Sequence, residues 1–146
     1  PDGIVIQSSA CLIGNSSQLS KSPEKRSMLR PALEFIEGHL SGQDLHTITA
    51  NVRGSSDATV AENVLANASV AGILGPTISR VAPPESSGSS GWFSVSVTVP
   101  RKLLLAAVDH LRSVGATSIV ARDADYVFDE TSCTYQTLLS TLGVEE

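Results

Sequence analysis

The sequence contains little cysteine, few aromatic residues and no long hydrophobic run. Its two cysteines, Cys11 and Cys133, lie in no CxxC or CxxH context, so their spacing supports neither a metal site nor a disulfide framework. Aromatic residues make up 4% of the 146 residues, whereas 41% are hydrophobic, and a core must therefore be built from Val, Ile, Leu and Ala. No apolar run approaches the roughly 18 residues that a membrane-spanning helix needs, so we expect no membrane span.

The chain also lacks clustered positive charge. Lys and Arg number 10 against 15 Asp and Glu, a net charge of -5, whereas non-specific nucleic-acid binding needs grouped Lys and Arg. Trp92 and Phe93 are adjacent, so they point to opposite faces of a strand. They therefore do not form the platform on which RNA-binding sheets stack bases, and we expect no nucleic-acid partner.

Residues 1–42 predict a strand followed by a helix. The apolar segment 3–15, "GIVIQSSACLIGN", is typical of a strand. Residues 22–24, "SPE", supply a capping hydroxyl and a proline at the first helical position. Pro31 means that the helix either bends there or begins there, and Gly42 is a credible end. The expected apolar face of this helix consists of Leu29, Leu33, Ile36 and Leu40.

Residues 45–128 show strand and helix patterns in the order β-α-β-β-α-β. The segments "LHTITANVR" and "WFSVSVTVP" alternate polar and apolar residues, as half-buried strands do. The order is that of the ferredoxin-like fold, a four-stranded antiparallel sheet with two helices on one face. We therefore predict an α+β protein with a ferredoxin-like βαββαβ domain over 43–146, which ends in a short helix and is preceded by the strand-helix segment. The expected apolar helix positions are Val60, Val64 and Leu65, then Leu104, Val108 and Leu111, with Gly115 as the end of the second helix.

The sequence contains no self-sufficient catalytic motif. It has no GxxxxGK[ST] or GxGxxG segment that would cradle a phosphate. The histidines lie far apart, at His39, His46 and His110, and positions late in helices favour a structural role for the first and third. An acidic cluster follows the last predicted strand and consists of Asp123, Asp125, Asp129 and Glu130. Paired carboxylates serve acid–base chemistry, but a solvated strand end is the favoured interpretation.

A set of motifs runs through the chain in a fixed order. They are "NVRGSSDATVAENVL", "GILGPTIS" and "FSVSVTVPRKLLLAAVDHLRSVGATSIVARDADYVFDE", preceded by "GIVIQSSACLIGN" and "PALEFIEGHL". Together they resemble the C-terminal part of the long-form ATP phosphoribosyltransferases. These glycosyltransferases join ATP to phosphoribosyl pyrophosphate in the first step of histidine biosynthesis. The plant- and alga-like branch is most similar, and the resemblance covers essentially the whole chain.

The resemblance implies a regulatory role. In that family the βαββαβ domain binds L-histidine, the end product of the pathway, and communicates inhibition to the catalytic domains of a hexamer. Residues 1–42 would then close the catalytic region, and 43–146 would form the regulatory domain. We expect L-histidine as effector, and catalytic domains and further copies of the chain as partners. The effector-binding residues carried over from the family are Ile73, Gly75, Pro76, Thr77 and Ser118.

Within this expected pocket, Gly75 and Pro76 would shape the turn, and the Thr77 hydroxyl would both donate and accept hydrogen bonds. Two features depart from the family pattern. Leu74 occupies a position that is usually polar. The family's acidic or polar contact just before the first regulatory helix would fall near Gly54 or Ser55, and neither of these residues supplies a carboxylate. Both departures change the polar complement of the pocket.

The resemblance also limits what this chain is expected to do alone. The family's phosphoribosyl-pyrophosphate loop would lie upstream of residue 1, so we expect no catalysis and no cofactor in this chain, with Mg²⁺ expected for the full-length enzyme. Because the chain begins at Pro1 without an initiator Met, we expect a piece of a longer or processed polypeptide. The implied compartment is the plastid stroma for a plant- or alga-type member and the cytoplasm otherwise.

Two other functions stay open at this point. A chain of this ancestry without a catalytic half would be a catalytically inactive structural or interaction subunit of a larger assembly. The length of the reading frame upstream of Pro1 distinguishes that alternative. A sensor of the same fold that binds a different small molecule is the other, and a ligand screen that includes histidine distinguishes it.

Overall fold

The computed structural model describes residues 8–67, 70, 75–82 and 91–145. These residues form two compact units. One consists of the described residues up to Phe35 together with those from Glu130 onward, and the other spans Ile36–Asp129. The division that the resemblance implies, after residue 42, stays a prediction.

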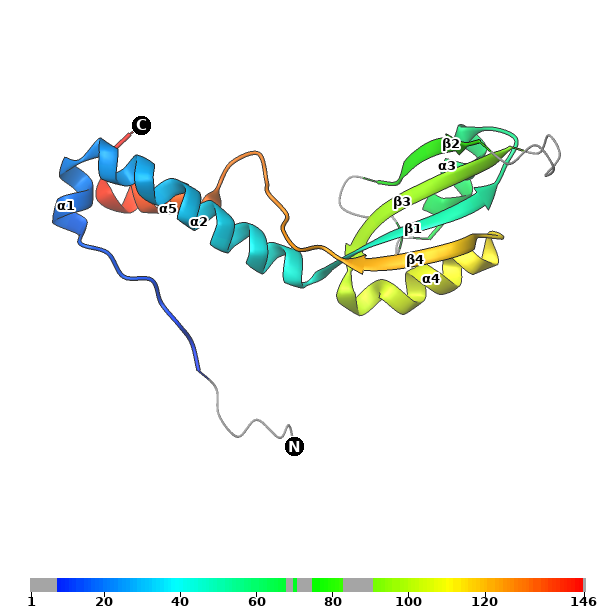
Figure 1. Ribbon diagram of the computed structural model, residues 1–146, viewed down its shortest axis with the longest axis horizontal. Helices are drawn as coiled ribbons and strands as arrows, with labels where there is room; N and C mark the ends of the chain where they lie inside the picture. Colours follow the sequence, from blue (N-terminus) through cyan, green and yellow to red (C-terminus); the bar gives the residue numbers. More distant parts are fainter. Residues whose placement is uncertain (1–7, 68–69, 71–74, 83–90, 146) are drawn as a thin grey trace. The chain divides into compact units, whose positions relative to one another are not determined.

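The larger unit is built on a four-stranded antiparallel sheet. Its strands lie in the order β2-β3-β1-β4, so β1 and β3 are central and β2 and β4 are the edges (Figure 1). Along the chain the order is β1, α3, β2, β3, α4, β4, which confirms the predicted ferredoxin-like arrangement. The bounds are β1 (Leu45–Arg53), α3 (Asp57–Leu65), β2 (Thr77–Val81), β3 (Trp92–Pro100), α4 (Leu104–Ser113) and β4 (Thr117–Asp123).

The hydrophobic core of this unit lies between one face of the sheet and the two helices. Every second residue of the central strands is buried, as the sequence alternation predicts. The buried strand residues are Ile48, Ala50, Val52, Phe93, Val95, Val97 and Val99. The helices contribute Val60, Val64, Ala107 and Leu111. Full burial of one such side chain stabilises a fold by roughly 1.5–3 kcal/mol, so this aliphatic alternation is what fixes α3 and α4 to this face.

Local signals place the ends of the two helices. Ser56 caps α3, because its Oγ accepts a hydrogen bond from the Thr59 backbone N–H at 3.2 Å. After α4 the chain turns through Gly115, whose φ of 81° is accessible to glycine without steric cost. The turn at Gly115 agrees with the predicted end of the second helix.

The smaller unit is helical. It contains α1 (Ser16–Lys21), the N-terminal part of α2 (Pro23–Gln43) and α5 (Cys133–Leu142). Its buried apolar residues are Leu33, Tyr135 and Leu139. Arg26 is also buried, and its Nη1 donates to the carbonyl oxygens of Leu19 and Ser20 at 2.8 and 3.2 Å. This guanidinium therefore caps the carboxyl end of α1.

The prediction of a strand over 3–15 is wrong for residues 8–15, which have no regular secondary structure; residues 3–7 lie outside the described residues. Leu12 and Ile13 are 67% and 91% exposed. No described strand pairs with this segment, so its backbone groups gain no ladder of hydrogen bonds. The polar segment that follows forms α1, and Asn15 caps this helix by accepting from the Gln18 backbone N–H at 3.1 Å.

Helix α2 begins at Pro23 with Ser22 as its cap, as predicted; the Ser22 Oγ accepts from the Lys25 N–H at 3.3 Å. Pro31 lies inside the helix, so the alternative of a helix beginning there is excluded. The predicted apolar face is only half buried, because Leu29 and Leu33 join the small core whereas Ile36 and Leu40 are 49% and 59% exposed.

Candidate functional site

The Gly75-Pro76-Thr77 segment leads the chain into edge strand β2. Gly75 has a φ of 87°, a left-handed conformation that glycine adopts without the steric cost paid by other residues. Thr77 is exposed, is the first residue of β2 and pairs with Ser96 of β3. The motif thus delivers a hydroxyl to the beginning of the edge strand. Ile73 and Leu74 lie outside the described residues.

Ser118 lies in a distorted part of the opposite edge strand, β4. Its φ is 53°, the one positive φ of a non-glycine residue among the described residues. The pairing of β1 with β4 shifts register between Thr49 and Asn51, opposite this point, which is typical of a β-bulge. Such strained conformations concentrate at functional sites. The Ser118 side chain is exposed at this point.

Thr77 and Ser118 lie on opposite edges of the sheet. Thr77 belongs to β2 and Ser118 to β4, and the order β2-β3-β1-β4 places the two central strands between these edge strands (Figure 1). Three interstrand spacings of about 4.8 Å amount to roughly 14 Å, more than a single amino-acid ligand can bridge. The structure therefore does not bring together the two hydroxyl residues predicted to share one pocket within a single chain.

The sheet face opposite the helices carries rows of polar side chains. One row runs from Thr77 across Ser96 to Thr49, and the next from Ser79 across Ser94 to Asn51. Farther along the central strands, the Oγ1 atoms of Thr47 and Thr98 lie 3.2 Å apart. Sequence reasoning missed these rows, although their signal is the polar half of the alternation in the two central strands.

The position of the expected carboxylate is closed at Gly54. A Cβ built there would overlap the Val60 side chain, and the Gly54 N–H donates to the Gly91 carbonyl at 3.0 Å. Ser55 is exposed, and its Oγ lies 3.3 Å from the Thr59 Oγ1. Packing against α3 thus explains why glycine occupies position 54, and Ser55 offers a neutral hydroxyl in place of a charge.

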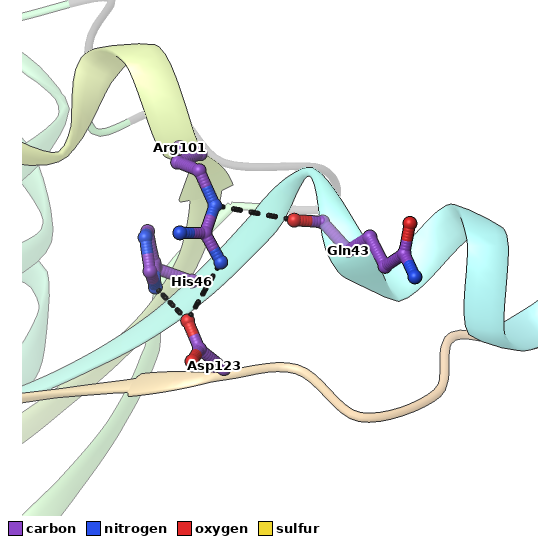
Figure 2. Close-up of polar contacts among 4 residues, drawn as sticks. All are labelled: Gln43, His46, Arg101 and Asp123. Carbon is purple, nitrogen blue, oxygen red and sulfur yellow. Dashed lines mark hydrogen bonds and ion pairs between the residues drawn. The ribbon is translucent and has the colours of Figure 1, made fainter.

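A polar junction joins the end of α2 to one end of the sheet (Figure 2). His46 is buried at the start of β1, and its Nδ1 lies 2.9 Å from the Asp123 Oδ1. Arg101 donates from Nη2 to the same oxygen at 3.0 Å and from Nε to the Gln43 carbonyl at 3.2 Å. A guanidinium at the carboxyl end of α2 is electrostatically favourable, so the junction has a structural explanation and needs no catalytic one.

The remaining histidines also contact backbone. The His39 Nδ1 lies 3.1 Å from the Asp125 carbonyl oxygen, and the His110 Nε2 lies 3.1 Å from the carbonyl oxygens of Asn63 and Val64. These contacts agree with the structural interpretation of His39 and His110. Of the acidic cluster, Asp123 is an ion-pair partner rather than a free carboxylate.

The described residues also bear on metal binding, membrane insertion and small-molecule cavities. No group of three or more His, Cys, Asp or Glu side chains among them could hold a metal ion, and none of the described helices is long and apolar enough to cross a membrane. The smaller unit contains a groove of about 850 Å³. Its described lining is mostly apolar and includes Leu12, Ile13, Met28 and Leu138, so it lacks an acid–base pair.

Comparison with known proteins decides the family. Residues 42–124, more than half of the chain, match the model of the family described as HisG, C-terminal domain. The chain belongs to this family. The matched range coincides closely with the sheet and its two helices, and the predicted resemblance to ATP phosphoribosyltransferases of the plant type is confirmed.

Curated relatives extend the similarity beyond that domain. The chain is 33% identical over 143 residues to "ATP phosphoribosyltransferase 1, chloroplastic" of Arabidopsis thaliana, covering 97% of this chain and 35% of the relative. It is 36% identical over 97 residues to an ATP phosphoribosyltransferase of Corynebacterium aurimucosum, covering 60% of this chain and 32% of that protein. The chain therefore spans about a third of the length of the relatives it matches.

Backbone strain at Ser118 predicts the direction in which substitution by glycine changes the free energy of unfolding. Ser118→Gly should leave the free energy of unfolding unchanged or raise it by up to about 1 kcal/mol, because glycine adopts a positive φ freely. Val120→Gly is a matched change at an ordinary position of the same strand and should lower it by about 1 kcal/mol. Urea denaturation followed by circular dichroism measures both. An equal loss at the two positions would contradict strain at Ser118.

Proposed function

We propose that this chain is the L-histidine-sensing, regulatory part of an ATP phosphoribosyltransferase. We further propose that histidine binds where the β2 edge of one copy meets the β4 edge of a second copy. The observation that carries the second proposal is the position of Thr77 and Ser118 on opposite edges of one sheet. If both contact one ligand, they must come from two chains.

The chemistry of the two edges suits a zwitterionic amino acid. Burial of an ammonium, a carboxylate and an imidazole costs free energy unless each finds a hydrogen-bonding partner. Thr77 and Ser118 each supply a hydroxyl that donates and accepts. Edge strands also present backbone N–H and C=O groups that have no neighbour in the sheet. Gly75 lies beside Thr77 and lacks a side chain, so a ligand could approach the backbone closely there.

A contact between the β2 edge and the β4 edge joins two different surfaces. Such a heterologous contact leaves one free edge of each type on a pair, so further copies add until the ring closes. The homo-oligomer implied by the family resemblance is therefore also what this site requires. Each contact in the ring would hold one histidine.

Regulation would follow from coupling between this site and a catalytic site elsewhere in the full-length enzyme. Such coupling conventionally amounts to about 1–3 kcal/mol. We propose the ATP phosphoribosyltransferase reaction, Mg²⁺ and the hexameric partners for that longer protein, and a plastid location by analogy with the chloroplastic relatives.

A catalytically inactive structural or interaction subunit is the second candidate. The observation that favours it is the closed position at Gly54, where packing against Val60 excludes the expected carboxylate. That candidate predicts assembly without histidine binding. A calorimetric titration with L-histidine, and then with other amino acids and adenine nucleotides, separates the two functions and also tests for a sensor of a different ligand.

Thr77→Val should weaken L-histidine binding about tenfold, since it removes one hydrogen bond worth about 1–1.5 kcal/mol while keeping the side-chain shape. Isothermal titration calorimetry of the chain measures the dissociation constant. Ser79→Ala is the control on the same strand and the same exposed face, and it should bind as the unmodified chain does. Equal affinities of the Thr77→Val and unmodified chains would remove Thr77 from the site.

Mixing two defective variants tests the shared site. Thr77→Val and Ser118→Ala should each weaken histidine binding alone, but a 1:1 mixture should regain full affinity at about a quarter of its contacts. Those contacts combine the intact Thr77 of one copy with the intact Ser118 of another. A pocket contained within one chain predicts no regain on mixing, and that result would overturn the two-copy site.

A further inference from the structure

Residues 124–129, here called the strap, follow β4 and lie along the last two turns of α2. The Val127 N–H donates to the Gly38 carbonyl at 2.9 Å, and the His39 Nδ1 lies 3.1 Å from the Asp125 carbonyl oxygen. At its beginning, the Ala124 N–H donates to the Leu45 carbonyl at 3.2 Å, so the strap continues the pairing of β4 with β1. The strap is therefore bonded to both the helix and the sheet.

Two glycines permit this close approach. Gly38 and Gly42 are four residues apart, so they lie on the same face of α2, and both are buried. A Cβ at Gly42 would overlap the Ala124 carbonyl oxygen and lie 3.0 Å from that of Asp125; a Cβ at Gly38 would lie 2.8 Å from the Phe128 ring. The helix thus presents a smooth surface on which the strap backbone and one aromatic ring lie directly.

Aromatic stacking and the polar junction hold the two sides of this contact. The Tyr126 and Phe128 rings are stacked with centroids 6.0 Å apart, and the Tyr126 ring lies 5.5 Å from that of His39. At the other end, Asp123 accepts from Arg101, which also bonds the last carbonyl of α2 at Gln43 (Figure 2). The strap is consequently attached along its length.

We propose that the strap and the Gly38–Gly42 face clamp residues 36–43 of α2 to the sheet. This part of the helix then moves as one rigid piece with the βαββαβ unit. A conformational change in that unit therefore also changes the conformation or position of residues 36–43. Asp44, the exposed residue between α2 and β1, is therefore not a hinge, because the strap and Arg101 each contact both the helix and the sheet. Only the hydrogen-exchange measurement with added L-histidine rests on the proposed function.

Gly42→Ala tests the clamp through the sign of its effect. Without the strap contact, alanine in a helix should raise amide protection in the last turns of α2 roughly fivefold, from helix propensity alone. The clamp predicts the opposite, because the new methyl group displaces a backbone carbonyl. Hydrogen exchange of the whole chain, followed by NMR, should show at least a tenfold loss of protection at the Val127 amide, with the Val97 amide of β3 unchanged. Raised protection at Val127 would overturn the clamp.

A double-mutant cycle covers the case in which Gly42→Ala unfolds the chain. Gly38→Ala should lower protection of the Val127 amide in the presence of Phe128, and raise or preserve it in a Phe128→Ala background, where the ring no longer fills the space. Equal effects of Gly38→Ala in the two backgrounds would contradict contact between the ring and the helix.

The histidine arm tests delivery into α2. Saturating L-histidine should change exchange of the amides of 36–43 in the unmodified chain, and this change should be lost in Gly42→Ala while protection near Thr77 persists. A response of 36–43 that survives in Gly42→Ala would overturn delivery through the clamp. If L-histidine protected no amide near Thr77 from exchange, that result would count against the proposed function. The exchange rate of the Val127 amide without ligand would still show whether the clamp exists.

Discussion

The antiparallel pairing of β1 with β3 sets the position of every other element in the larger unit. Nine residues of each strand are in register, from Leu45 opposite Pro100 to Arg53 opposite Trp92. This pairing directs the apolar halves of both strands to one face, where α3 and α4 cover them. It also leaves only the outer sides of the pair for β2 and β4, which therefore become opposite edges.

From that constraint follows the form of the site. Among the described strands, β2 and β4 each have one side that pairs with no other strand. Each edge carries a feature that ordinary strand geometry does not require: Gly75 has a φ of 87° beside β2, and Ser118 has a φ of 53° within β4. Binding of a ligand between two such edges would be coupled to association of the two copies, because neither edge alone forms the complete site. The strap on α2 would then carry the state of the sheet into the helix.

Much of the fold was predictable from the sequence because its signals are local. Period-two alternation marked the central strands, Ser22 and Pro23 marked the start of α2, and Gly115 marked the end of α4. The separation of Thr77 from Ser118 instead depends on the order of the strands in the sheet. A transfer of single site residues from the family to this sequence contains no information about that order. Ser118 gives no sequence signal of a positive φ, and Asn15 as the cap of α1 was hidden among other polar residues. Gly42 was interpreted as a helix end, whereas its main role is contact with the strap, a segment more than 80 residues away in the chain.

The most direct test of the two-copy site is paramagnetic relaxation between copies. In one copy, Cys11→Ser and Cys133→Ser remove the exposed native thiols, and Ser79→Cys carries a nitroxide label on β2. The other copy has the unmodified sequence and is labelled with ¹⁵N. If histidine binds between the β2 edge of one copy and the β4 edge of another, L-histidine should broaden the amides of residues 117–120 on β4 of the ¹⁵N copy. Broadening confined to β2 of that copy, or none when histidine is bound, would contradict it.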